Sequence, residues 1–388
     1  MAGHDIIVVG ASAGGVTALE SLFANLPPDL PAAVCVVLHV AAGKPSILPD
    51  ILRRSRGLHV AHAVDGEAII YGRGYVAPPD RHLLLENQRL RLTRGPRENM
   101  SRPAIDPLFR TAAVQYGPRV VGVLLTGMMD DGSAGLAAIK ACGGKAIVQD
   151  PLTATWPDMP LAAMRSVPVD YCLPLSDIPA VLVRLVSRRA GRRVRCSPPL
   201  DVQFQVSTEK GSDDMRKLLE TEGRPSQLAC PECQGPIWEL KEAGAPHFRC
   251  QVGHAFNGES FREAQTERIE RALWTAVSAL EDKAAFSRRL EARMRAANMA
   301  NIARMYEEER VKAARQADLI RRVILGKPKK ERRNGSLPKR AATRADGRRA
   351  SPRPRRGRPA SRTRTLARTR TEALGARRAA PEFPPLPQ

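Results

Sequence analysis

Three short segments of the sequence carry residue types that could act together in covalent catalysis. Ser12 lies in residues 10–14, GASAG, which have the G-x-S-x-G spacing that presents a serine hydroxyl from a strand-to-helix turn. His39 follows one apolar run, and Asp130 and Asp131 follow another. A serine nucleophile needs a base that takes its proton and an acid that orients the base. The segments therefore predict a serine hydrolase site, although their order, Ser, His, Asp, differs from that of the α/β-hydrolases.

Residues 10–15 have two other interpretations. The dinucleotide fingerprint G-x-G-x-x-G has a glycine in the middle position, where the backbone touches a pyrophosphate, and here Ser12 stands in that position. A Cβ and a hydroxyl would obstruct the phosphate, which disfavours a dinucleotide site. Alternatively, Ser12 only caps the following helix through its hydroxyl. The stretch by itself does not separate a cap from a nucleophile.

Each of these segments follows a predicted buried strand. Residues 6–9, 32–40 and 119–125 are apolar and rich in β-branched side chains, and helical patterns follow the first and the third run. Strands that alternate with helices imply a mainly parallel sheet covered on both faces. The carboxyl ends of parallel strands share one edge, so Ser12 and His39 are expected to meet there with an aspartate. Further strands are predicted at residues 68–76, 82–92 and 144–149, and a helix at residues 133–142.

The histidine and the aspartates also have simpler interpretations. His39 could be a strand-end histidine whose ring is satisfied by backbone groups. Two adjacent carboxylates at the end of a buried strand are costly unless they are exposed or paired, and an imidazole N–H would pair one of them. The other could cap the helix that begins at Ser133. The remaining histidines of this region, which lie in polar surroundings or before the first strand, are weaker candidates for the base: His4, His59, His62 and His82.

Six motifs follow one another along the chain: GASAGG at residues 10–15, LHV at 38–40, SRPAIDPLF at 101–109, LTGMMDDGSAG at 125–135, QDP at 149–151 and DMP at 158–160. In this order they resemble the catalytic domain of the chemotaxis protein-glutamate methylesterases, the CheB type. The resemblance covers about residues 5–187, and it implies a three-layer α/β/α sandwich with a mostly parallel sheet. It also implies a serine esterase site without a catalytic cofactor, in which Ser12 is the nucleophile, His39 the general base and Asp131 the orienting acid.

The same resemblance implies an oxyanion hole made by the backbone N–H groups of Ala13 and Met128, donors aimed at a developing negative charge. Two positions depart from the family pattern. The family commonly has Thr at the position of Ala13, which is harmless if only the backbone N–H is used. It commonly has Gly-Asn at residues 129–130, where this chain has Met-Asp. The second departure leaves open whether Asp130 shares the role of Asp131.

Regulation is expected to differ from that of the family pattern. The chemotaxis methylesterases usually carry a phosphoacceptor receiver domain ahead of the esterase domain, whereas this sequence starts directly at the first catalytic strand. We therefore expect control by a partner or by the C-terminal regions.

A cluster of cysteine and histidine residues predicts a metal site. Cys230 and Cys233 form a C-x₂-C pair, and Cys250 and His254 follow as C-x₃-H. This spacing is typical of a Cys₃His zinc ribbon with a structural ion that substitutes for a small core. His247 is the one plausible substitute ligand. The two segments also resemble the C-terminal zinc-binding appendage of some stand-alone CheB-like proteins.

Composition shifts divide the rest of the chain. The segment after the metal unit is proline-free and charged, with apolar residues at 4-3-4 spacing, and its seam would allow self-association. The C-terminal segment has too few apolar residues to bury. The predicted division is 1–190, catalytic domain; 191–223, linker; 224–258, zinc ribbon; 259–325, long helix, coiled coil or helical hairpin; and 326–388, disordered Arg-rich tail.

Most of the positive charge belongs to that tail. From residue 327 onward the chain has 20 basic and 4 acidic residues, which account for +16 of the net +22. The excess therefore does not make the main domain a nucleic-acid-binding protein. Two interpretations of the tail stay open: loose binding to an acidic partner, nucleic acid or anionic membrane, or a solvated tail without a specific partner.

No apolar run reaches the 18 residues of a membrane span, and the N-terminus lacks the pattern of a secretory signal. An odd cysteine count with one cluster favours a reducing compartment and a metal over a disulfide framework. The sequence thus predicts a cytoplasmic serine esterase. With the resemblance, its expected substrates are glutamate γ-methyl esters, and glutamine amides, of chemoreceptor-type signalling proteins. The alternative is a catalytically silent CheB-like scaffold that recruits partners through its zinc ribbon, helix and basic tail.

Overall fold

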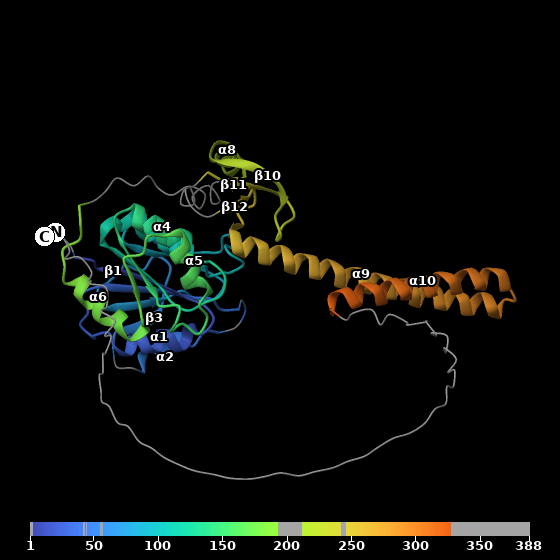
Figure 1. Cartoon of the computed structure of the whole chain (residues 1–388), viewed down its shortest axis with the longest axis horizontal. Helices are drawn as coiled ribbons and strands as arrows, with labels where there is room; N and C mark the ends of the chain where they lie inside the picture. Colours follow the sequence, from blue (N-terminus) through green and yellow to red (C-terminus); the bar gives the residue numbers. More distant parts are fainter. Residues whose placement is uncertain are drawn as a thin grey trace, which may run out of the picture. The chain divides into compact units, whose positions relative to one another are not determined.

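The centre of the N-terminal part of the chain is a seven-stranded sheet in which all neighbouring strands are parallel. This computed structural model describes residues 3–41, 43, 45–54, 57–192, 212–241 and 246–326. The strand order is β3-β4-β2-β1-β7-β8-β9 (Figure 1). The strands are β1 (Ile6–Ala11), β2 (Ala33–Leu38), β3 (His59–His62), β4 (Arg73–Val76), β7 (Val120–Leu124), β8 (Lys145–Gln149) and β9 (Tyr171–Leu173).

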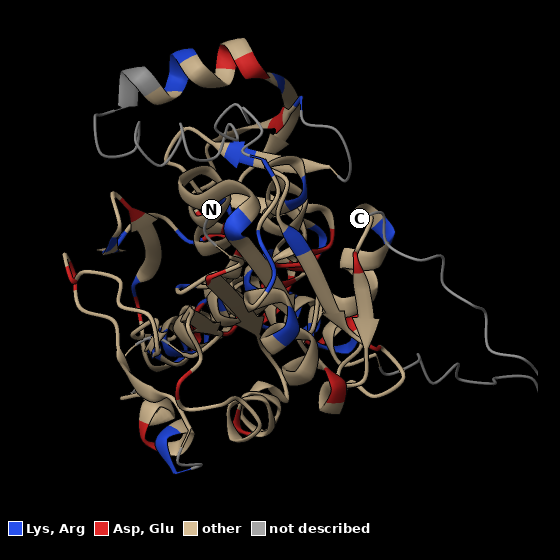
Figure 2. Ribbon diagram, turned by 90° about the vertical axis from the view of Figure 1, so that its left-hand side faces the viewer, with Lys and Arg blue, Asp and Glu red and all other residues tan. Residues whose placement is uncertain are grey.

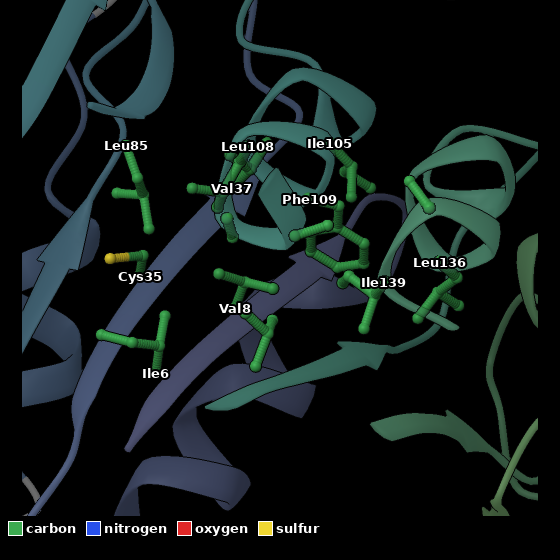
Figure 3. Close-up of a cluster of buried hydrophobic side chains, with 14 of the residues drawn as sticks. Ile6, Val8, Cys35, Val37, Leu85, Ile105, Leu108, Phe109, Leu136 and Ile139 are labelled. Atoms are coloured by element: carbon green, nitrogen blue, oxygen red, sulfur yellow. The ribbon is translucent and has the colours of Figure 1, made fainter. Parts of the chain in front are cut away.

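Alternating side chains of the strands contribute to two hydrophobic cores, one on each face of the sheet. In β1, Ile6 and Val8 belong to one core and Ile7 and Val9 to the other, and none of the four is exposed. The consecutive apolar residues of β1 are thus required by burial on both faces. The first core packs under α3, α4 and α5 (Figure 3), and the second under α1, α2 and α6. These helices are α1 (Gly15–Ala24), α2 (Leu48–Arg53), α3 (Ile105–Tyr116), α4 (Ser133–Ala141), α5 (Asp158–Ser166) and α6 (Ile178–Val186).

The predicted three-layer α/β/α sandwich with a mostly parallel sheet is confirmed, but two strand predictions differ in detail. The single strand expected at residues 82–92 is wrong, because β5 (His82–Glu86) and β6 (Arg89–Thr93) form a separate antiparallel pair. Asn87 and Gln88 join them with φ angles of 49° and 61°, as in a tight two-residue hairpin turn. The strand expected at residues 68–76 is shorter, since β4 begins at Arg73.

A second, four-stranded antiparallel sheet lies in the C-terminal part, in the order β10-β11-β12-β13. A helix, α8, precedes it inside the stretch that was expected to be a linker. Met215 and Leu219 of α8 lie four residues apart, on one helix face, and pack with Leu240. That pair is too short a pattern to predict a helix from sequence. The elements are α8 (Ser212–Glu222), β10 (Gly223–Ala229), β11 (Pro236–Leu240), β12 (His247–Cys250) and β13 (Ala255–Asn257).

Residues 258–324 form two helices, α9 (Gly258–Ala296) and α10 (Ala300–Ile324), that pack against each other. Asn298, in the turn between them, has a φ of 58°, a left-handed conformation that Asn tolerates better than most residues. Several side chains buried along the two helices are small, among them Ala284, Ala303 and Ala313. Small side chains allow the two helices to approach closely. Of the three forms that the apolar seam allowed, the structure has the helical hairpin.

Charges of both signs are interspersed over the described part of the chain (Figure 2). The predictions for the Arg-rich tail from residue 327 onward and for linker residues 193–211 lie outside the described residues. Among the described helices, none combines the length and apolar character needed to cross a membrane.

One cysteine departs from expectation. Cys142, at the C-terminal end of α4, is disulfide-bonded, whereas the cysteine pattern favoured a metal over disulfides. Cys35, Cys172 and the three clustered cysteines are free.

Candidate active site

Ser12 stands directly after β1, in the turn that leads into α1. Its backbone N–H donates to the carbonyl oxygen of Thr126, 3.0 Å away, which ties the turn to the end of the neighbouring strand β7. Gly14 begins the helix with a φ of 74°, a left-handed conformation that glycine adopts without steric cost. Gly127 passes so close that an added Cβ would lie 2.8 Å from the Cβ of Ser12. Glycine at both positions therefore lets the serine turn and the β7 loop lie against each other.

His39 stands directly after β2, beside Ser12. The strands pair in register, with Ala11 opposite Leu38, so the residue that follows each strand reaches the same edge. The ring Nδ1 of His39 lies 3.0 Å from Ser12 Oγ, and Nε2 lies 2.7 Å from Asp131 Oδ2. Since the carboxylate accepts the Nε2 proton, Nδ1 is left to accept the serine proton. The structure thus brings the three sequence-predicted residues together in one hydrogen-bonded line.

Asp131, in the loop after β7, is 2% exposed and accepts five hydrogen bonds. Burial by itself would raise the pKa of its carboxyl, but the hydrogen bond and charge of His39 and the N–H donors outweigh burial and lower the pKa to about 2. The carboxylate is therefore ionised at neutral pH and able to stabilise a protonated imidazole. The other donors are the backbone N–H groups of Ile105, Asp106 and Gly132 and the side-chain amide of Asn99.

Asp130 has a different set of partners. Its carboxylate accepts hydrogen bonds from the backbone N–H groups of Glu259 (2.8 Å) and Ser260 (3.1 Å) and from the Ser260 hydroxyl. It therefore caps the N-terminus of α9 and does not contact His39. Burial raises the pKa of this carboxyl, and the hydrogen bonds from Ser260 and Glu259 oppose that rise. The expectation that an aspartate caps the Ser133 helix does not describe Asp130, whose cap lies on a helix far away in the sequence.

The backbone N–H groups of Ala13 and Met128 lie in the two turns that flank Ser12. Within the described part of the chain, neither group donates a hydrogen bond, whereas the neighbouring N–H groups of Ser12 and Gly127 both do. The hydroxyl of Thr126 donates to the Ala13 carbonyl at 3.0 Å and so holds the two turns together. Two free donors beside a nucleophile are what an oxyanion requires.

Sequence reasoning missed two polar residues behind Asp131. The side-chain amide of Asn99 donates both to Asp131 Oδ1 (2.8 Å) and to Asp106 Oδ2 (2.9 Å). Asp106 is fully buried in the first turn of α3, and its other oxygen accepts the Gly135 N–H at 2.6 Å. Burial, and then the charge of Asp131, raise the pKa of Asp106 to about 7. A signal was present: an aspartate inside the apolar SRPAIDPLF motif, with Arg110 four residues later.

The weaker histidine candidates take no part in this line. The rings of His62 and His82 lie 3.0 Å from the carbonyl oxygens of Ser46 and Pro96, respectively. Both are histidines satisfied by the backbone, the simpler interpretation that had been considered for His39.

The donor atoms of Cys230, Cys233, Cys250 and His254 all lie within 4.8 Å of one another. Cys233 Sγ is 3.6 Å from Cys250 Sγ, which is 3.5 Å from His254 Nδ1. A tetrahedral zinc with Zn–S bonds of about 2.3 Å places neighbouring sulfurs about 3.8 Å apart. The four residues thus fit a zinc ion by number, chemistry and spacing, and His247 lies outside the group.

Comparisons with known proteins agree on one family for the first half of the chain. Residues 7–182 match the family described as CheB methylesterase. A Leptospira interrogans protein named protein-glutamate methylesterase/protein-glutamine glutaminase is 40% identical over 183 residues, which are 47% of this chain and 95% of that protein. An Anaeromyxobacter dehalogenans protein of that name, numbered 2, is 42% identical over 181 residues, 47% of this chain and 53% of that protein. The chain spans nearly all of the first relative and about half of the second.

A solved structure also aligns with part of the chain. The crystal structure of the Thermotoga maritima CheB methylesterase catalytic domain aligns with 48% of this chain and with all of its own chain, at 35% identity and a TM-score of 0.46.

Proposed function

Since this chain belongs to the CheB methylesterase family, we propose that residues 1–190 hydrolyse glutamate γ-methyl esters in chemoreceptor-type signalling proteins. The same site would hydrolyse the side-chain amide of glutamine, the second activity in the names of the relatives. The observation that carries the proposal is the line of Ser12, His39 and Asp131, joined by contacts of 3.0 and 2.7 Å at the carboxyl edge of the sheet.

In the proposed reaction Ser12 Oγ attacks the ester carbonyl carbon while His39 Nδ1 takes the hydroxyl proton. The carbonyl oxygen becomes negative and accepts hydrogen bonds from the N–H groups of Ala13 and Met128. His39 then gives its proton to the leaving methoxide, which departs as methanol. Throughout, the Asp131 carboxylate holds the Nε2 proton and stabilises the imidazolium.

A second half-reaction restores the enzyme. His39 takes a proton from a water molecule, the hydroxide attacks the acyl-enzyme carbonyl, and the Ser12–acyl bond breaks as Ser12 regains a proton from His39. The product is the free glutamate carboxylate. These steps use only side chains and backbone groups of this chain, so we propose no catalytic cofactor.

Methanol release from a methylated chemoreceptor tests the proposal. We expect the wild-type protein to release methanol, and Ser12→Ala to lose the activity because, among the described residues, Ser12 supplies the one hydroxyl that is hydrogen-bonded to His39. The matched control is Ser176→Ala, which changes an exposed serine in the short turn before α6. Full activity of Ser12→Ala would refute the mechanism.

A serine-directed phosphonate probe distinguishes an active esterase from the scaffold alternative. Such a probe reports an activated serine whatever the ester substrate is. We expect it to label wild-type protein and to spare Ser12→Ala. An unlabelled wild-type protein would favour a silent scaffold that works through its C-terminal regions.

We further propose that Cys230, Cys233, Cys250 and His254 bind one structural zinc ion. The spacing of the donor atoms and the small core beside them support this role, since a metal can replace the core that so small a sheet lacks. Elemental analysis should give one zinc per chain, and Cys230→Ser should lower that content. Protein without zinc would contradict the assignment.

The remaining proposals rest on sequence. We propose the domain division at residues 190, 223, 258 and 325, and a cytoplasmic location. We also propose that residues 259–325 mediate self-association and that the tail binds an acidic partner or nucleic acid. A truncation after residue 326 tests the tail: salt-sensitive binding to nucleic acid should be present in the full chain and absent from the truncated one.

A further inference from the structure

Residues 224–258, which hold the four proposed zinc ligands and are called the metal-binding unit here, are joined to the catalytic domain by backbone hydrogen bonds beside the catalytic residues. Residues 1–328 form one compact unit. The Ala255 carbonyl of β13 accepts the Asn99 N–H at 2.9 Å, and the Ala255 N–H donates to the Arg97 carbonyl at 3.3 Å. Met100 packs on the hydrophobic cluster that contains Phe256 and Phe261. The loop before α3 is therefore hydrogen-bonded through its backbone to β13, a strand of the C-terminal sheet.

Asn257 ends β13, and its buried side chain reaches the carboxylates behind the catalytic site. Its Nδ2 donates to Asp106 Oδ2 (2.9 Å) and to the Asp130 carbonyl (3.1 Å). Its backbone N–H donates to Asn99 Oδ1 at 2.8 Å. That last bond orients the Asn99 amide, because it takes the oxygen and leaves the Nδ2 group to face Asp106 and Asp131. One residue, Asn99, thus separates Asn257 from the proposed catalytic acid.

The start of α9 holds the same loop from its other side. The carboxylate of Asp130, next to Asp131 in the chain, accepts the first free N–H groups of α9 and the Ser260 hydroxyl. A carboxylate at a helix N-terminus is favoured both by those donors and by the helix dipole. The backbone and side chain of Asp130 are therefore both bound by residues 257–260.

A buried charge cluster ties the two parts together. Glu98 is 4% exposed and lies between Arg110 of α3 (2.5 Å) and Arg249 of β12 (3.1 Å), each 1% exposed. Of these two ion pairs, Glu98–Arg249 spans the two parts, so it fixes their contact next to Asn99 in the chain.

We propose that Asn257 is a positioning residue of the esterase site, which acts through Asn99 and Asp106 to hold Asp131 in line with His39. The inference rests on the proposed function, and it gives the metal-binding unit a direct part in turnover. Asn257 touches neither the serine nor the histidine, so it acts on the orientation of the acid and not on substrate binding.

The electrostatics of the buried pair agree with this role. Asp106 and Asp131 share one amide donor, and each raises the cost of charge on the other. Arg110, 3.9 Å from Asp106, and the donors Gly135 N–H and Asn257 Nδ2 favour the ionised Asp106. Loss of the Asn257 side chain removes one of these donors and the hydrogen bond to the Asp130 carbonyl, while the backbone N–H of residue 257 still binds Asn99 Oδ1.

The test compares Asn257→Ala and Asn257→Asp in the full chain, with Val252→Ala as the matched control at an exposed position of the same unit. A displaced acid should lower kcat by about tenfold to a hundredfold, with little change in KM. Asn257→Asp, with the same shape and no donor, should be affected at least as strongly as Asn257→Ala.

Asn99→Ala approaches the same link from the catalytic side and should reproduce the fall in kcat with little change in KM. Phosphonate labelling of Ser12, measured in parallel, needs no ester substrate. Slower labelling of the Asn257 variants than of wild type would support the inference even if wild type released no methanol, an outcome that would overturn only the proposed substrate. Folded Asn257 variants with wild-type labelling rates and a wild-type kcat would overturn the inference.

Discussion

Replacement of Asp131 by asparagine tests how the catalytic line works. Asparagine keeps the shape of the side chain but exchanges one accepting oxygen for an NH₂ group. In the protein, Oδ1 accepts three N–H donors, and Oδ2 accepts His39 Nε2 and the Ile105 N–H. The amide nitrogen will therefore take the place of Oδ2, where it meets one N–H donor, that of Ile105, besides His39, and not the three donors that face Oδ1.

In that orientation the asparagine N–H donates to His39 Nε2, and the ring proton moves to Nδ1. Nδ1 is the atom 3.0 Å from Ser12 Oγ, so the base can no longer accept the serine proton. The wrong tautomer in a serine protease lowers kcat by about 10⁴, and a fall of about 10³–10⁴, or roughly 4–5.5 kcal/mol of transition-state stabilisation, is expected here.

Methanol release at saturating substrate measures kcat, and a thermal melt shows that the variant is folded. Asp29→Asn, at an exposed position before β2, controls for the loss of a carboxylate. If Asp131→Asn kept kcat within tenfold of wild type while Ser12→Ala was inactive, Asp131 would not set the tautomer of His39 and the reasoning would fail.

Three further predictions concern the supports of the site. Gly127→Ala would bring a Cβ to 2.3 Å from Met159 Sδ and 2.8 Å from the Cβ of Ser12. We therefore expect the free energy of unfolding in urea to fall by about 1–3 kcal/mol, and kcat to fall as well. An unchanged unfolding curve would contradict the close packing. Metal removal by a chelator, or Cys230→Ser, should lower the melting temperature of the full chain. Added zinc should restore the melting temperature of the wild-type protein but not that of the variant. Equal melting temperatures with and without metal would argue against a structural ion. The pKa of Asp131 is lowered to about 2, so its contribution to stability is present above about pH 4 and lost as pH falls toward 2. The pKa difference corresponds to about 2–3 kcal/mol in wild type, and urea unfolding of Asp131→Asn should lack that part of the acid sensitivity.

Much of the fold follows from local patterns. The β-branched runs of β1, β2 and β7 are buried on both faces, so burial alone required consecutive apolar residues there. Local patterns were insufficient where the signal was only a few residues long. The turn at Asn87 and Gln88 divided a predicted strand into a hairpin, and α8 is defined by a contact of Met215 and Leu219 with a distant strand.

The sequence by itself determined which side chains are candidates for the chemistry: a serine at a strand-to-helix turn, a histidine and an aspartate at other strand ends, and three cysteines and a histidine at the spacing of a zinc ribbon. It could do so because residues that follow parallel strands reach one edge whatever the helices between them are. Only the tertiary structure decided which aspartate faces His39. The reason is physical and distant in sequence, since the free N–H groups of α9 bind Asp130, and Asn99 and three backbone N–H groups hold Asp131. No local pattern around residues 130–131 contains the helix that begins at Gly258.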